Sequence, residues 1–140
     1  MRIAMIACTF IWAGMILGIS FLEAPLKFRA PHITTELGLG IGKVVFTALN
    51  RVEIVLTLIL VAGLIITKPP PKMYWLFALP MGILLIQSLW LLPVLTQRID
   101  KILAGQSLPG SYHHLVFIVL EVSKVIGLIV AGVHLVKCSK

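Results

Sequence analysis

The sequence predicts an all-α fold, an integral membrane four-helix bundle whose helices run up, down, up and down. Of its 140 residues, 59% are hydrophobic and 12% are charged, a composition typical of membrane proteins. The apolar residues form four runs, each long enough to cross about 30 Å of hydrocarbon as a helix. We expect spans at about 3–24, 43–67, 73–97 and 112–136, forming a single transmembrane domain over residues 1–140.

The net charge of +7 would suggest a nucleic-acid partner in a soluble protein. Here the basic residues lie mostly at the ends of the spans, where they can meet anionic lipid headgroups. We therefore expect membrane lipids as partners and no nucleic acid. Cys8 and Cys138 lack metal-ligand spacing and are expected to be structural thiols, with a disulfide as the alternative.

The first span follows Arg2 and runs from Ile3 to Leu22. It begins like a signal peptide, but no small-x-small cleavage site leads into a polar domain, so we expect a membrane helix. Gly14 and Gly18 form a small-xxx-small pair that permits another helix to approach closely. We expect this pair to serve packing within the chain, with oligomerisation as the alternative.

The end of the first span leads into a connection expected over residues 28–42, the longest in the chain. Glu23 and Lys27 have ion-pair spacing if the helix continues through the proline between them. The tract GLGIG lacks the Lys-Ser/Thr ending and the preceding strand of a phosphate loop. Thr34 or Thr35 is expected to cap a short interfacial helix.

The second span is interrupted by Asn50, Arg51 and Glu53. The apolar residues after this triplet are too few to cross the membrane, so the triplet is expected to lie below its surface. Asn50, Glu53 and Thr57 share a helix face, whereas Arg51 points away and can reach outward. The segment KPPPK then ends the helix.

The third span contains Pro80 and Pro93, which a membrane bundle tolerates when neighbouring groups satisfy the freed carbonyls. Gln87 and Trp90 lie near each other on one face of this helix. Trp90 is either a packing residue or an interfacial anchor.

The fourth span carries the most informative polar residues. A charge near the bilayer centre costs at least about 2.5 kcal/mol, so Glu121 and Lys124 require compensation. His114 and Glu121 lie nearly above one another on the helix, and Lys124 lies on the same broad face. We expect other spans to meet this polar stripe.

The polar residues of all four spans converge on one half of the bundle. We call the side that holds both termini side A and the opposite side B. The candidate site comprises the polar residues expected near side B: Glu23, Asn50, Glu53, Gln87, Trp90, His114, Glu121 and Lys124. Three interpretations stay open: an internal ion-pair network, a pocket that binds a small ligand, lipid headgroup or ion, and an interface with a partner helix in a homo-oligomer or larger complex.

Conventional catalytic motifs are absent from the sequence, so an enzyme is uncertain and not favoured. For a metal, Glu23, Glu53, His114 and Glu121 offer ligands without a Glu-x-x-His or His-x-x-x-His pair. Any cofactor stays unknown. A small transporter with Glu121 as its proton-titrating group is a further alternative.

The run WAGMILGISFLEAPLKFRAP places a tryptophan and a glycine early in the first helix, followed by a small-Pro-x-x-Phe exit at Ala24, Pro25 and Phe28. It resembles the first helix of small bacterial four-span membrane proteins in a family known as a domain of unknown function, to which a eukaryotic drug-resistance-associated transmembrane protein is related. The stretches LLPVLTQRIDKILAG and SYHHLVFIVLEVSKVIGLIVAG resemble the family's third-helix exit and fourth helix. The resemblance implies four spans and no established activity.

The step from Asn50 to Glu53 is similar to an Asn-x-x-Glu motif of the membrane-associated eicosanoid and glutathione metabolism proteins. In that family the motif belongs to a glutathione site at a trimer interface and follows several arginines. Residues 43–49 contain no arginine, which removes much of the electrostatics of thiol binding. A glutathione-transferase-like enzyme is therefore kept only as an alternative.

The basic residues are tied between the two sides of the predicted membrane bundle. Because those on side A lie closer to the span ends, we favour cytoplasmic termini. The expected location is a bacterial inner membrane, with the polar pocket opening outward.

Overall fold

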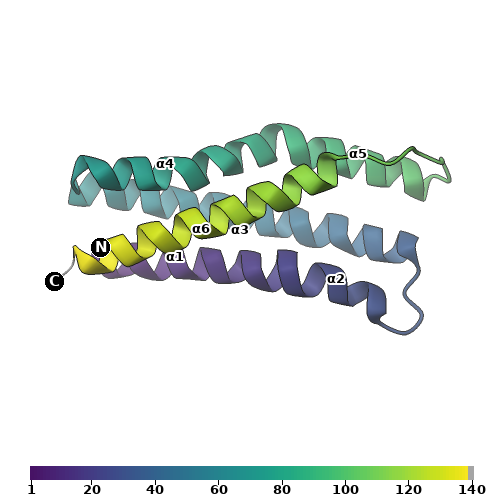
Figure 1. Cartoon of the computed structure of the whole chain (residues 1–140), viewed down its shortest axis with the longest axis horizontal. Coiled ribbons are helices and arrows are strands. Elements are labelled where there is room, and N and C mark those ends of the chain that lie inside the picture. Colours follow the sequence, from purple (N-terminus) through teal and green to yellow (C-terminus); the bar gives the residue numbers. More distant parts are fainter. Residues whose placement is uncertain (139–140) are drawn as a thin grey trace.

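The structure, a computed structural model, describes residues 1–138. Its four membrane-length apolar helices are Arg2–Arg29, Thr35–Thr67, Pro71–Leu103 and His113–Lys137, called the first to fourth spans below. Successive spans are antiparallel, and the first span begins and the fourth span ends at side A (Figure 1). The predicted all-α, multi-pass membrane bundle is confirmed.

The first span changes its helical form along its length. It comprises α1 (Arg2–Ile16), the π-helical η1 (Leu17–Glu23), α2 (Ala24–Leu26) and the 3₁₀-helical η2 (Lys27–Arg29). The π segment ends just before Pro25, whose ring crowds the preceding turn and whose nitrogen has no hydrogen to donate. The helix thus continues through the proline, and Lys27 Nζ lies 3.4 Å from Glu23 Oε2.

The second span is a single helix, α3 (Thr35–Thr67). Thr34 is a helix cap as expected, because its hydroxyl accepts a 3.1 Å hydrogen bond from the Leu37 amide. The helix that it caps is the whole second span, so the expectation of a short interfacial helix at this place is wrong. The prediction of a long connection over residues 28–42 is wrong, since only residues 30–34 separate the two spans. The glycines in this stretch belong to the helix, and two of them, Gly38 and Gly42, leave room for Phe28 and Lys27 of the first span.

The third span also contains a π segment. It comprises α4 (Pro71–Ile86), the π-helical η3 (Gln87–Leu91) and α5 (Leu92–Leu103). As in the first span, a proline is the second residue after the π segment, here Pro93 of α5. The fourth span is α6 (His113–Lys137), a continuous α-helix.

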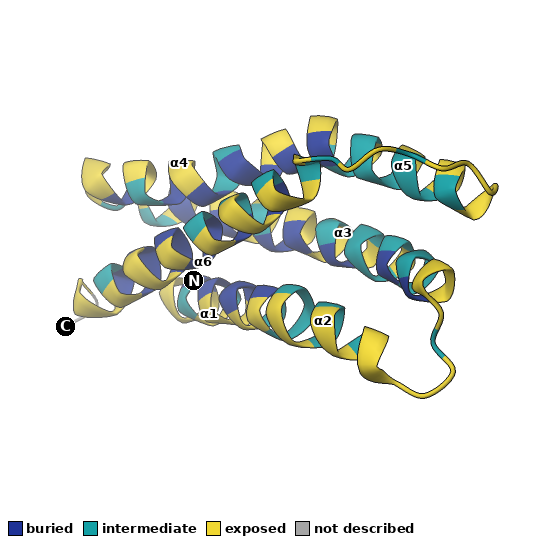
Figure 2. Cartoon of the chain, turned by 45° about the vertical axis from the view of Figure 1, so that its right-hand side comes forward, coloured by how far each residue is buried: buried dark blue, intermediate teal, exposed yellow. Residues whose placement is uncertain are grey.

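The bundle is packed more tightly towards side A than towards side B. The apolar core includes Met5, Leu60, Phe77 and Leu128, none of which is exposed. Figure 2 shows buried residues gathered in the centre and towards the termini, while α2 and α5 carry mostly intermediate and exposed residues.

Gly14 and Gly18 face away from this core. No atom of the described residues would lie within 4 Å of a Cβ added at either position. The prediction that this pair serves packing within the chain is therefore wrong. By contrast, Gly63 and Gly132 leave room for Met5 and Phe10 of α1.

Candidate functional site

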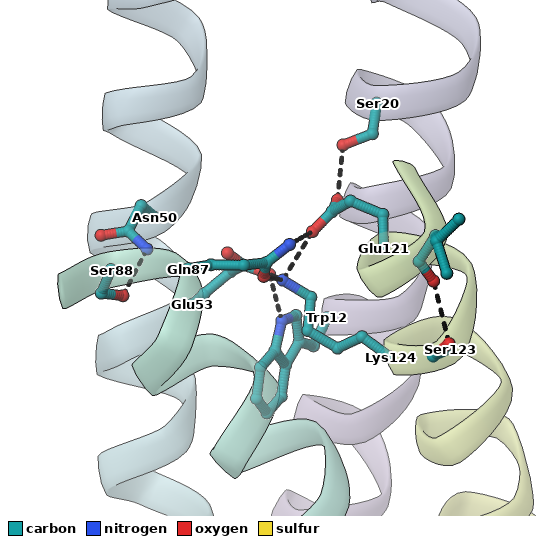
Figure 3. A network of polar contacts seen from close by, with 10 residues as sticks. Trp12, Ser20, Asn50, Glu53, Gln87, Ser88, Glu121, Ser123 and Lys124 are labelled. Atoms are coloured by element: carbon teal, nitrogen blue, oxygen red, sulfur yellow. Dashed lines mark hydrogen bonds and ion pairs between the residues drawn. The ribbon is translucent and has the colours of Figure 1, made fainter. Parts of the chain in front are cut away.

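Lys124 stands at the centre of a buried group of polar side chains (Figure 3). Its Nζ atom lies 2.6 Å from Glu53 Oε1, 2.7 Å from Glu121 Oε1 and 2.6 Å from Gln87 Oε1. An ammonium has three hydrogens to donate, so these three acceptors satisfy it completely. With 0% of Lys124 exposed, its charge is held by these partners alone.

Three further hydrogen bonds surround this centre. Trp12 Nε1 donates to Glu53 Oε1 at 2.7 Å, Gln87 Nε2 donates to Glu121 Oε1 at 2.9 Å, and Ser20 Oγ donates to Glu121 Oε2 at 2.6 Å. All four spans thus contribute to one group, which we call the polar cluster: Trp12, Ser20, Glu53, Gln87, Glu121 and Lys124. It joins the four spans near the middle of their lengths.

The local helix geometry explains how these side chains meet. Glu121 and Lys124 are three positions apart on α6 and therefore lie on one face. Ser20 lies within the π segment of the first span, and Gln87 begins that of the third. π segments are rare and often occur at functional sites. Here both supply side chains that reach the face of α6.

Of the candidate residues, Glu53, Gln87, Glu121 and Lys124 meet in the polar cluster. Asn50 lies one turn from Glu53 and donates a 2.7 Å hydrogen bond to Ser88 Oγ. One candidate from each of the second, third and fourth spans is thus brought to Lys124: Glu53, Gln87 and Glu121.

Besides Asn50, three candidates lie outside the polar cluster. Glu23 pairs with Lys27 on its own helix, because their spacing brings them together one turn beyond the cluster. Trp90 is 48% exposed, and its ring packs edge-on against His113 with centroids 6.2 Å apart. His114 lines a cavity described below.

Sequence reasoning missed Trp12 and Ser20 as members of the site. Trp12 lies in the middle of its span, away from the interfaces where tryptophan usually serves as an anchor. A buried indole N–H usually has a hydrogen-bond partner. The mid-span position of Trp12 was therefore the signal in the sequence that its N–H bonds to another polar side chain. For Ser20 the only signal in the sequence was its hydroxyl group. Its contact with Glu121 depends on the π segment, which the sequence did not reveal.

Thr57 lies one turn beyond Glu53 on α3. The sequence predicts that it shares a helix face with Asn50 and Glu53. Its Oγ1 atom is buried and has no hydrogen-bond partner within residues 1–138. The threonine therefore adds polarity beside the polar cluster without joining it.

A cavity of about 660 Å³ extends from the polar cluster towards side B. Ser20 and Glu121 form its inner end, and no other residue of the cluster lines it. Its walls are mostly apolar and come from all four spans, including Phe46, Leu95 and Phe117. We call it the side B cavity.

Three basic side chains, Lys27, Lys43 and Arg98, line the side B cavity away from its inner end. We call them the basic rim. Lys43 forms an ion pair with Asp100, and Lys27 pairs with Glu23. Arg98 Nη2 donates to the carbonyl oxygen of Pro109 at 2.6 Å. Arg98 is thus the residue of the basic rim that hydrogen-bonds to a neutral group and, among residues 1–138, forms no ion pair.

The metal hypothesis gains no support from the described part of the chain. It contains no group of three or more His, Cys, Asp or Glu side chains placed to hold a metal ion. Both cysteines are free thiols, so the alternative of a disulfide is wrong. The polar atoms of the cluster are instead engaged with one another.

Asn50 and Glu53, which carry the resemblance to a glutathione site, are both occupied within the chain. Asn50 contacts Ser88, while Glu53 contacts Trp12 and Lys124. The side chain of Glu53 is almost fully buried, with 3% exposed. A glutathione molecule would have to displace these partners.

Comparison of the chain with family models, curated proteins and solved structures gives no match. The cluster and the side B cavity are therefore the features from which a function can be argued.

Proposed function

We propose that the protein binds an amphipathic, lipid-like molecule in the side B cavity. The apolar part of the molecule fills the space between the spans, and its anionic headgroup meets the basic rim. The observation that carries this proposal is the combination of an apolar-walled cavity of about 660 Å³ with Lys27, Lys43 and Arg98 along it.

The size and polarity of the cavity favour this class of ligand. Ligand pockets commonly enclose about 300–1,000 Å³ and combine apolar walls with a few polar groups. The side B cavity falls in this range and is bounded by aromatic and aliphatic side chains. An acyl chain or a ligand of similar size matches these walls.

The charge of the rim favours an anionic headgroup. Three cations line the cavity, and two of them have acidic partners, Glu23 and Asp100, so the basic rim and these two partners together carry a net charge of +1. Basic side chains near the membrane surface attract anionic lipids by about 1 kcal/mol each. Arg98, which lacks a carboxylate partner among the described residues, is expected to contribute most.

The test is native mass spectrometry of the protein with phosphatidylglycerol and, separately, phosphatidylcholine. We expect preferential retention of phosphatidylglycerol, weaker retention in Arg98→Gln, and loss in Ile99→Trp, because the indole occupies the cavity. Leu85→Trp is the matched control, since Leu85 is 60% exposed on α4. Equal retention in both tryptophan variants contradicts the proposal.

The host membrane is inferred from the sequence and not from the cavity. We propose a bacterial inner membrane, because the run from Trp12 to Pro31 resembles the first helix of small bacterial four-span proteins. Fractionation of bacterial cells that express the tagged chain tests this location. Recovery with outer-membrane or soluble markers contradicts it.

A second candidate function is assembly with another copy of this chain. Gly14 of α1 and Gly18 of η1 favour it, because no atom of the described residues lies within 4 Å of a Cβ added at either position and small residues permit close helix contact in membranes. We expect Gly14→Leu to reduce the proportion of dimers in nanodisc photobleaching counts. Gly82→Leu is the control, and equal effects of the two substitutions rule out this interface.

A further inference from the structure

Lys27 is a second buried lysine, and its contacts differ from those of Lys124. Its side chain is 10% exposed and lines the side B cavity. Its one hydrogen-bond partner among residues 1–138 is Glu23 Oε2, at 3.4 Å, whereas Lys124 has three acceptors at 2.6–2.7 Å. An ammonium has three hydrogens to donate, so two of those on Lys27 have no acceptor in the described part of the chain.

The nearest neighbours of the Lys27 ammonium are largely apolar. Its Nζ atom lies 5.7 Å from the ring centroid of Phe28 and 5.5 Å from that of Phe46. Gly42 leaves room for it, because a Cβ added there would lie 3.0 Å from Nζ. Aromatic faces attract a cation, but a buried ammonium also requires hydrogen-bond acceptors. These surroundings therefore favour a further oxygen atom beside Lys27.

The other two members of the basic rim are more accessible to water. The side chain of Lys43 is 37% exposed, and its partner Asp100 is 55% exposed. Arg98 is partly exposed and donates to the carbonyl oxygen of Pro109. Lys27 is thus the rim residue for which a further acceptor has to come from within the cavity.

We propose that Lys27 binds a negatively charged oxygen, of a carboxylate or a phosphate, at the polar end of the ligand and so selects which amphipathic molecules the side B cavity takes. This inference rests on the lipid-like ligand proposed above and names the chemistry of its headgroup. Glu23 is the competing acceptor. When the oxyanion binds, Lys27 exchanges the long contact with Glu23 for shorter charge-assisted hydrogen bonds, and the Glu23 carboxylate, 33% exposed, turns towards water.

Three probes with the same chain test the proposal: hexadecanoate, hexadecyl phosphate and the uncharged hexadecanol. Their dissociation constants are measured by native mass spectrometry of the full chain from a mildly alkaline buffer, which keeps both acids ionised. The wild type should bind at least one anionic probe about tenfold more tightly than hexadecanol, as expected for one added charge-assisted hydrogen bond. The tighter of the two acids shows whether the headgroup is a carboxylate or a phosphate.

Lys27→Met should remove the preference for the anionic probes over hexadecanol. Lys101→Met is the matched control, because it changes the net charge equally at an exposed residue outside the cavity. The control should keep the preference. A preference that is absent from the wild type, or that is the same in Lys27→Met as in the wild type, overturns the proposal.

Glu23→Gln separates a binding role of Lys27 from a purely structural one. Removal of the competing carboxylate should strengthen binding of the anionic probes several-fold and leave hexadecanol unchanged. Glu36→Gln is the control, because it alters the net charge equally at an exposed residue outside the cavity. Weaker anion binding in Glu23→Gln, or equal gains in both variants, contradicts the proposal even if Lys27→Met does not fold.

Hexadecanol distinguishes failure of this inference from failure of the proposed function. If the wild type binds hexadecanol and Ile99→Trp excludes it, while Lys27→Met leaves the preference among the probes unaltered, the lipid site stands and the role of Lys27 is wrong. If no probe binds the wild type, both proposals are wrong.

Discussion

Lys124 shows how a charged side chain becomes part of the interior of a membrane bundle. It is surrounded by three acceptors from three different spans, with none of its surface exposed. Removing one partner of a buried ion pair usually costs more than the pair itself contributes, because the remaining charge is left uncompensated. The cluster is therefore sensitive to single substitutions.

Lys124→Met should destabilise the protein by about 3–5 kcal/mol, since two carboxyl groups lose their shared ammonium. The free energy of unfolding can be measured by steric trapping in bicelles. Lys101→Met is the control, because Lys101 is exposed on α5. A similar, small effect of the two substitutions would show that the cluster contributes little.

Trp12→Phe should cost about 1–3 kcal/mol, the usual penalty for a buried acceptor that loses its donor. Phenylalanine keeps an apolar ring but is smaller than the fully buried indole, so the loss combines the missing hydrogen bond to Glu53 Oε1 with a cavity in the core. Trp75→Phe serves as the comparison, because Trp75 is 79% exposed and should change stability little. The same unfolding measurement applies, and matching losses would exclude a role for the indole N–H.

At the scale of the helical elements, glycine and proline shape the site. The prolines at positions 25 and 93 each follow a π segment, and these segments carry Ser20 and Gln87. Gly38 and Gly42 of α3 lie against Phe28 and Lys27 of the first span. These small residues let the first span approach the second beside the side B cavity.

Gly38→Ala should destabilise the bundle, because the added Cβ overlaps the ring of Phe28. Gly40→Ala provides a matched control on the same helix, since nothing within the described residues lies within 4 Å of its added Cβ. This control should be neutral or stabilising by up to about 1 kcal/mol, the helix-propensity difference between the two residues. Thermal unfolding in detergent compares them, and the reverse order would contradict the packing.

The sequence predicted the four spans well because apolar length alone determines them. It also identified Glu53, Gln87, Glu121 and Lys124, since each stands out against an apolar helix. It placed a loop where α3 begins, because glycines in the tract GLGIG look like a loop when their close contacts are unknown. The π segments were not predictable either, since they depend on how Pro25 and Pro93 are accommodated in the bundle.

At the scale of the whole molecule, the two halves of the bundle differ. The side A half is a packed apolar core. The polar cluster lies between this core and the side B half, which contains the cavity. The sequence predicted the convergence of polar residues from antiparallel order. The side B cavity could not be predicted from the sequence, because its volume depends on how far the spans separate beyond the polar cluster.

The most direct test of this account is photo-crosslinking with phosphatidylglycerol that carries a diazirine within one acyl chain, followed by mass spectrometry of the labelled peptides. We predict labels on cavity walls, at Phe46, Leu95 and Phe117, and competition by unlabelled phosphatidylglycerol. Labels confined to lipid-facing positions such as Leu85 and Ile126, without competition, would contradict the account.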